Sequence, residues 1–307
     1  MRASAFILIA LLTAASAQEP QPNIQLSADL RDDARLTAIV AAYSKGYGKE
    51  FGGAARNAAG EIVFRFVGRE FVYDDAKKKT FADLLDRPDI KDTFCQTYPI
   101  RNPTDRLPEN FDPGRFRVEE LFKALYGSTE SEVLHNCITV DFCGHQVKFN
   151  ARCGAADALR AVGKNLEALL VKKPALKEYV AELGGTFQWR FIAGTKRLSN
   201  HSFANAIDLN VKKSAYWRWE PSSKLSTFSR KDWPVEIVEA FENHGFIWGG
   251  KWWHYDTMHF EFRPELIAYA RAHPAEPAPG PVGDEKNAKP SSNKNGDTVL
   301  PLTDAVR

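Results

Sequence analysis

The chain has 307 residues, of which 44% are hydrophobic and 26% are charged, and its formal net charge is only +2. This composition is typical of a globular protein with one large domain or two smaller ones. The small net charge lacks the basic footprint of a nucleic-acid-binding protein, so we expect no nucleic-acid partner.

The N-terminus has the pattern of a secretory signal peptide. Arg2 is followed by the apolar run AFILIALL and then by the small residues 15–17. A membrane anchor is the alternative, but this run is shorter than the roughly 20 residues that a spanning helix needs. We therefore predict a signal peptide at residues 1–17 and a periplasmic or secreted mature protein. No later segment is apolar enough to span a membrane, so we expect no stable membrane insertion after cleavage.

Residues 18–130 form an N-terminal region after the predicted signal peptide. No motif in this region indicates its role. Apolar spacing predicts a helix over 32–43, alternation predicts a β-hairpin that turns near Gly68, and a short helix should end at Gly127. The Asp- and Pro-rich residues 86–114 should be irregular.

A second unit, residues 131–272, is predicted to hold the catalytic domain. Its expected elements, in chain order, are a hairpin around Gly144, a helix over 154–172, a short helix from Pro174 to Gly184, strands over 187–194 and 201–211, a helix from a cap at Asp232 to Asn243, the strand MHFEF and a helix from Pro264. Strands and helices come in groups, which predicts an α+β fold with a largely antiparallel sheet and flanking helices. Residues 273–307 have few large apolar side chains and are predicted to be a disordered tail.

Export would place the cysteines in an oxidising compartment. Their number is even, which favours two disulfides whose pairing stays open among three arrangements. The alternative is a zinc cluster that adds His135 or His145, although the close C-x-x-C pairs of structural zinc sites are absent. The four disulfide candidates are Cys95, Cys137, Cys143 and Cys153.

Two polar segments carry the chemistry. SNHSFANAIDLN contains His201 and Asp208, and WHYDTMHFEF contains Asp256 and His259. Two imidazoles and one carboxylate suit a catalytic zinc ion with a fourth position for water, and a nearby unligated carboxylate suits the transfer of a proton. The same residues also fit a structural interpretation, with hydrogen-bonded histidines, a turn at Asp208 and a loop cap at Asp256. The helical H-E-x-x-H signature is absent.

The two segments resemble the motifs of a known family. RLSNHSFANAIDLN is similar to the S-x-H-x-x-G-x-A-x-D block of the VanY-like zinc peptidases, which include D-Ala-D-Ala carboxypeptidases and L-Ala-D-Glu endopeptidases. FIWGGKWWHYDTMHFEF resembles the G-F-x-W-G-G-x-W…D-x-x-H-F block of the endopeptidase-like branch. The resemblance covers about residues 135–270 and departs from the pattern at Ala204, where the family has glycine.

This resemblance implies a DD-peptidase/Hedgehog-like fold with one zinc ion per chain. It also implies that the protein acts on peptidoglycan stem peptides. It assigns the metal ligands to His201, Asp208 and His259 and the catalytic carboxylate to Asp256. Arg190 would stabilise the oxyanion or bind a substrate carboxylate. The expected substrate contacts are Ser199, Arg197 and Trp252.

Weaker candidates remain open. Glu261 is either an alternative base or a residue that supports His259. His254 either acts in the transition state or caps a loop. The clustered tryptophans either line a substrate groove or fill the core. Besides a peptidase, the sequence allows a non-catalytic cell-wall or zinc-binding module on the same fold, or a disulfide-stabilised exported protein without a metal. The bond that is cut and the oligomeric state are not determined by the sequence.

Overall fold

The structure is a computed structural model that describes residues 25–100, 107–230 and 232–274. The predicted signal peptide and nearly all of the predicted tail lie outside these residues. Within the described ranges, no helix combines the length and the apolar character needed to cross a membrane.

The N-terminal region is built on a four-stranded sheet in the order β1-β2-β3-β4. Helix α1 packs against β2, and β1 pairs with β2 in parallel while the other pairs are antiparallel. The predicted helix and hairpin are confirmed, and the hairpin turns at Gly68 with a φ of 80°. The bounds are β1 Gln25–Leu26, α1 Ala34–Tyr47, β2 Phe51–Arg56, β3 Ile62–Phe66 and β4 Arg69–Val72.

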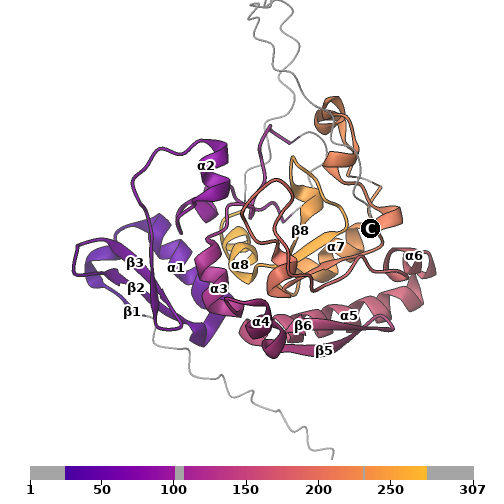
Figure 1. Cartoon of the computed structure of the whole chain (residues 1–307), viewed down its shortest axis with the longest axis horizontal. Coiled ribbons are helices and arrows are strands. Elements are labelled where there is room, and N and C mark those ends of the chain that lie inside the picture. The colour runs from indigo at the N-terminus through magenta and orange to yellow at the C-terminus, as the bar shows by residue number, and fades with distance from the viewer. Residues whose placement is uncertain (1–24, 101–106, 231, 275–307) are drawn as a thin grey trace, which may run out of the picture. The chain divides into compact units, whose positions relative to one another are not determined.

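Short helices connect this sheet to a second, two-stranded sheet. Helix α3 ends at Gly127 as predicted, where a φ of 130° favours glycine. The hairpin β5–β6 turns at Gly144, and Figure 1 shows the long helix α5 lying along it. The bounds are α2 Phe81–Asp86, α3 Glu119–Tyr126, α4 Glu130–Asn136, β5 Cys137–Phe142, β6 His145–Asn150, α5 Ala155–Lys172 and α6 Lys177–Val180.

A third sheet, in the order β7-β9-β8, lies at the end of the chain and is antiparallel throughout. Helix α8 follows it and packs against α1 of the N-terminal region. The approach is close at Gly46, where a Cβ atom would lie 2.7 Å from the backbone nitrogen of Glu265. The bounds are β7 Ala206–Asp208, α7 Val235–Glu242, β8 Phe246–Trp248, β9 His259–Phe262 and α8 Pro264–Ala272.

The α+β class is confirmed, but three small sheets replace the single large sheet that the pattern suggested. One strand prediction is wrong, because residues 187–194 form no strand. The prediction for 201–211 is confirmed only for the three-residue β7, which follows a 3-10 helix, η6 (Asn200–Phe203). Helix α7 is capped by Pro234 and not by Asp232.

The predicted disulfides are absent, because all four cysteines are free thiols in the structure. Cys137 begins β5 and Cys143 directly follows its last residue, so the two lie about 20 Å apart at the usual rise of a strand, which is too far for a disulfide. The thiol of Cys153 faces helix α3, where its Sγ lies 3.9 Å from the carbonyl oxygen of Leu125. The alternative cysteine–histidine zinc cluster is likewise not assembled within the described ranges.

Candidate metal centre

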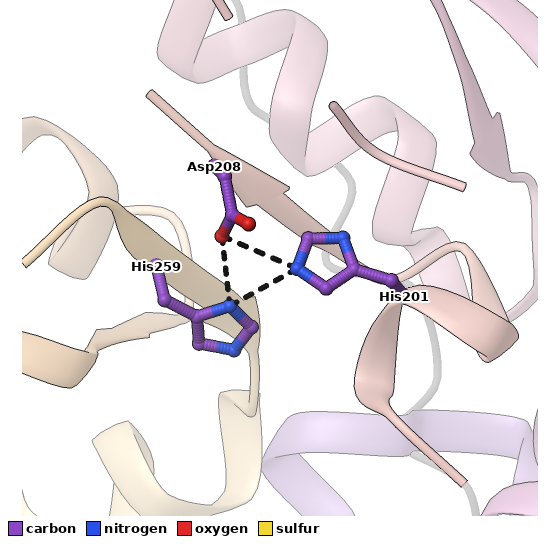
Figure 2. A group of neighbouring side chains, drawn as sticks. All are labelled: His201, Asp208 and His259. Carbon is purple, nitrogen blue, oxygen red and sulfur yellow. Dashed lines mark hydrogen bonds and ion pairs between the residues drawn. The ribbon is translucent and has the colours of Figure 1, made fainter. Parts of the chain in front are cut away.

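Three side chains from η6, β7 and β9 converge on one point. His201 Nε2 lies 3.2 Å from Asp208 Oδ1, and His259 Nδ1 lies 3.0 Å from the same oxygen. The two nitrogens are 3.2 Å apart, and Figure 2 shows all three side chains facing one another. The register of the third sheet produces part of this geometry, because Asp208 pairs directly with His259 across β7 and β9.

The backbone of Asp208 is fixed by hydrogen bonds to two consecutive glycines. Its backbone N–H donates to the carbonyl oxygen of Gly185, and its carbonyl oxygen accepts from the N–H of Gly184. A Cβ atom on Gly184 would lie only 2.8 Å from the Cβ atom of Asp208. The sequence pattern treated these glycines as the end of a helix, whereas the structure uses them to fit a backbone segment against Asp208.

Hydrogen bonds on the outer nitrogens fix how the two imidazoles face the centre. His201 Nδ1 lies 2.9 Å from the carbonyl oxygen of Thr186, and His259 Nε2 lies 3.0 Å from Glu261 Oε2. Both oxygens only accept, so each outer nitrogen carries a hydrogen. When the two rings are neutral, their inner nitrogens direct lone pairs at the carboxylate oxygen of Asp208, which is repulsive unless a proton or a metal ion lies between them.

The donor set and its spacing fit a zinc ion. Tetrahedral ligands at bond lengths of about 2.0–2.1 Å are about 3.3–3.4 Å apart. The three donor atoms here are separated by 3.0–3.2 Å. Two imidazoles and a carboxylate are also the ligand types of catalytic zinc sites, and three protein ligands leave one position open.

The pKa values show that the centre favours positive charge. Burial acts to lower the pKa of His259, but the hydrogen bonds with Asp208 and Glu261 outweigh it and raise this pKa to about 10. Burial acts to raise the pKa of Asp208, and the two histidines hold it far below its usual value. A proton on the inner nitrogen of His259 can be shared with only one of the other two donor atoms at a time. A metal ion can bind all three donor atoms at once.

Asp256 supplies a carboxylate beside the three donors. Burial and the charge of Asp208 raise the pKa of Asp256 to about 7, against the opposing effect of both histidines. Its Oδ1 atom is buried and has no hydrogen-bond partner. A carboxylate with a pKa near neutrality and a free oxygen has the properties of a general base.

The comparison with protein families agrees with this geometry. Residues 193–262 match a family described as D-alanyl-D-alanine carboxypeptidase. This segment is less than a quarter of the chain, yet it contains all three converging donors and Asp256. The match supports the resemblance to the VanY-like zinc peptidases and indicates a peptidase. The curated proteins and the solved structures gave no match to the chain.

A buried network of ion pairs holds the imidazole of His259 through the nitrogen that faces away from the other two donors. Glu261 bonds to His259 through Oε2 and to Arg263 through Oε1, at 3.0 and 3.1 Å. Arg263 also donates to Glu265, which accepts from the hydroxyl of Tyr47 in α1. Asn200 donates to Glu261 as well. Glu261 therefore holds the ligand through its second nitrogen, and the chain of contacts reaches the N-terminal region.

The N-terminal region also supplies Arg115, which the sequence did not single out. The Arg115 guanidinium lies over the Trp252 ring at 5.8 Å, and that ring is centred 5.7 Å from the imidazole of His259. Arg115 acts to lower the pKa of Asp256. Trp252 itself is buried and donates to the carbonyl oxygen of Pro113, so it packs between Arg115 and the centre.

The remaining predicted residues lie around the centre in different roles. Ser199 is buried and caps η6 by accepting from the N–H of His201 at 3.4 Å. Arg190 is exposed and donates to Gln188. Arg197 forms an ion pair with Asp86 at 3.0 Å. His254 Nδ1 lies 2.6 Å from Asp112 Oδ2, so it is anchored to the N-terminal region.

Tyr216 is a further neighbour that sequence patterns missed. It pairs with Asp256 through an isolated β-bridge. Burial raises the pKa of Tyr216, Arg218, Arg115 and Arg190 lower it, and Asp256 raises it further. Its hydroxyl therefore lies among the charges that surround the centre.

Ala204, at the position of the family glycine, adopts a left-handed conformation with a φ of 51° and is fully buried. Its carbonyl oxygen accepts from the N–H of Asn150 in β6 at 2.8 Å. An alanine in this conformation costs roughly 1–2 kcal/mol. The chain therefore needs this turn between His201 and Asp208 enough to tolerate the strain.

A second group of carboxylates, Asp74, Asp75 and Asp89, is close enough to hold a cation. The ammonium of Lys79 already occupies it, at 2.9 Å from Asp75 and 3.0 Å from Asp89. Asp74 pairs with Lys91 as well, so lysine side chains already bind all three carboxylates and the cluster competes poorly for a metal ion.

Proposed function

We propose that this chain is an exported zinc metallopeptidase that hydrolyses peptidoglycan stem peptides, of the D-Ala-D-Ala carboxypeptidase or L-Ala-D-Glu endopeptidase type, on a DD-peptidase/Hedgehog-like fold. The observation that carries the proposal is the convergence of three lone-pair donors beside the free carboxylate oxygen of Asp256. The family match over residues 193–262 supports the peptidase activity. The signal-peptide pattern supports export, and the motif from Gly245 onwards favours the endopeptidase branch.

His201, Asp208 and His259 would hold the zinc ion. When bound, zinc supplies a Lewis acid that polarises the scissile carbonyl and lowers the pKa of a coordinated water. Asp256 accepts the proton of the attacking water and delivers it to the leaving amine. Arg190 and Arg115 offer positive charge for the oxyanion or for a substrate carboxylate.

The experiment that tests this proposal is the incubation of zinc-loaded protein with purified muropeptides, with products identified by mass spectrometry. Cleavage is expected, and the product mass identifies the bond. Asp256→Asn should keep one zinc ion per chain and lower kcat by about 10²–10⁴-fold, the usual contribution of a general base.

The matched control is Asp157→Asn, an exposed aspartate on α5 that should leave the rate unchanged. Absence of product from the wild-type protein that binds zinc would favour the non-catalytic zinc-binding module. Absence of zinc after reconstitution would contradict both interpretations. Equal rates for wild type and Asp256→Asn would remove Asp256 from the mechanism.

A further inference from the structure

A cavity of about 870 Å³ lies between the N-terminal region and the loop that precedes the metal ligands. Its walls come from residues 85–88, 115, 117–120 and 194–197, and we call it the cationic cleft. Five cationic and three acidic side chains line it, so its formal charge is +2. Most of its wall therefore comes from a region outside the matched family segment.

The acidic residues of the cationic cleft all form ion pairs, and Glu120 has a second cation in Arg69, at 3.6 Å. Glu119 and Glu120 both form ion pairs with Lys123, at 2.9 and 2.8 Å, and Lys123 is not part of the cleft wall. Asp86 pairs with Arg197. Two cations of the wall are paired in the same way with carboxylates outside it, Arg87 with Asp83 and Arg115 with Asp112. The ion pairs therefore leave the charge that a ligand meets close to the formal +2.

Two cations of the cleft lack a carboxylate partner among the described residues. Arg117 donates to the carbonyl oxygen of Leu198 at 2.6 Å, but its Nε atom is buried without a hydrogen-bond partner. Lys196 is exposed and forms no ion pair in the described part of the chain. A buried N–H without an acceptor, such as that of Arg117 Nε, is costly, and a bound anion would relieve that cost.

Two arginines of the cleft wall also contact residues beside the metal centre. Arg115 lines the cleft and also lies over Trp252, which packs beside His259. Arg117 holds Leu198, the residue directly before the Ser199 cap of η6. A peptide bound across the metal centre would therefore reach the cleft on the side of the N-terminal region.

The wall chemistry selects a carboxylate. Guanidinium groups present planar donors that match a carboxylate in shape. The three acidic side chains keep the formal charge of the cleft at +2, which suits a single carboxylate better than a polyanion such as a nucleic acid or a teichoic acid-like chain.

We propose that the cationic cleft binds a carboxylate of the peptide substrate and thereby selects acidic stem peptides. This inference rests on the proposed peptidase function for the identity of the ligand. It assigns a role in substrate selection to residues 85–88, 115 and 117–120 of the N-terminal region.

The test compares two synthetic stem peptides, L-Ala-γ-D-Glu-L-Lys-D-Ala-D-Ala with the glutamate α-carboxylate free and the same peptide as the carboxamide. Binding is measured by calorimetry on zinc-loaded Asp256→Asn protein, which keeps all three donors and does not require turnover. The free carboxylate should bind at least about tenfold more tightly, as expected for a charged hydrogen bond. In the Lys196→Gln/Arg197→Gln variant this ratio should fall to about threefold or less.

The control is Lys164→Gln, an exposed lysine on α5, which should keep the full ratio. Equal affinities for both peptides, or a ratio that survives in the double variant, would overturn the cleft as a carboxylate site. Muropeptide cleavage by the wild-type protein is recorded separately. A protein that binds with the predicted ratio but never cleaves would refute the peptidase function and retain the cleft.

Discussion

The N-terminal sheet and the sheet of the metal centre differ in what they bury. Around Phe64 the N-terminal sheet buries aromatic rings, with centroid distances of 5.5–5.8 Å to Tyr43, Phe51 and Tyr73. The metal-centre sheet and its η6 helix bury histidines, carboxylates, amides and an arginine. Apolar burial is favourable without partners, whereas a buried polar group is favourable only when every bond is made. The second sheet therefore holds a group of donors that a bound cation would satisfy, whereas the first sheet holds no such group.

His259→Ala would disrupt this group of donors most severely. Removal of one donor leaves His201 and Asp208 with too few protein ligands for a catalytic zinc site. We expect zinc content to fall from about one per chain to near zero, measured by elemental analysis, and peptidase activity to disappear. His244→Ala, a histidine that bonds to Asn165 outside the centre, should keep the zinc. A full complement of zinc in His259→Ala would contradict the assignment of the ligands.

Phe64→Ala tests the N-terminal sheet, where we expect a loss of stability without a loss of zinc affinity. Phe64 is fully buried, and truncation of such a ring costs about 3–5 kcal/mol of the free energy of unfolding. Urea titration of the zinc-loaded protein should show this loss, while the folded fraction keeps its zinc affinity. A loss of zinc affinity as large as the loss of stability would mean that the two sheets do not differ as described.

Glu261→Gln sharpens the comparison, because it changes a residue behind a donor. The carboxylate orients His259 and raises its basicity, so its neutral amide should weaken zinc binding by about 10–100-fold in competition with a chelator. Glu242→Gln is the matched control, since Glu242 is equally buried and pairs with Lys251 at 2.5 Å away from the donors. Equal zinc affinities in the two variants would show that Glu261 acts only in folding.

Ala204→Gly should have the smallest effect. Glycine removes the strain of the left-handed backbone, but it also loses a buried methyl group and gains conformational freedom in the unfolded chain. We expect these effects to offset one another, so that the free energy of unfolding changes by less than about 1 kcal/mol. A larger stabilisation in urea titrations would show that the strain dominates.

The difference between apolar and polar burial explains which features could be predicted from the sequence. Helix α5 and the hairpins β3–β4 and β5–β6 bury apolar side chains at regular spacing, so their patterns were visible. The sequence predicts strands over 187–194 and 201–211, which the structure does not form apart from β7. Instead, Ser202 bonds to the carbonyl oxygens of Gln188 and Arg190, and Ser199 caps η6, so side chains replace a ladder of backbone bonds.

The donor triad of His201, Asp208 and His259 was suggested by residue types and by the family motif, and the structure brings the three together. Arg115 and Tyr47 could not be found in this way. They lie 144 and 212 residues before His259, and no local pattern reports contacts over such separations. The disulfide prediction relied on the number of cysteines alone, which carries no information on where strand β5 places them.

The buried contacts of Arg263 bear on how this chain could be divided or transplanted. The recognisable family segment ends at residue 262, one position before Arg263, whose guanidinium balances Glu261 and also donates to the carbonyl oxygen of Gly114. A graft of the segment alone onto another scaffold would carry all three donors but leave the Glu261 carboxylate without its counter-charge. The smallest transferable unit therefore includes α8 and the N-terminal helix α1 that packs on it.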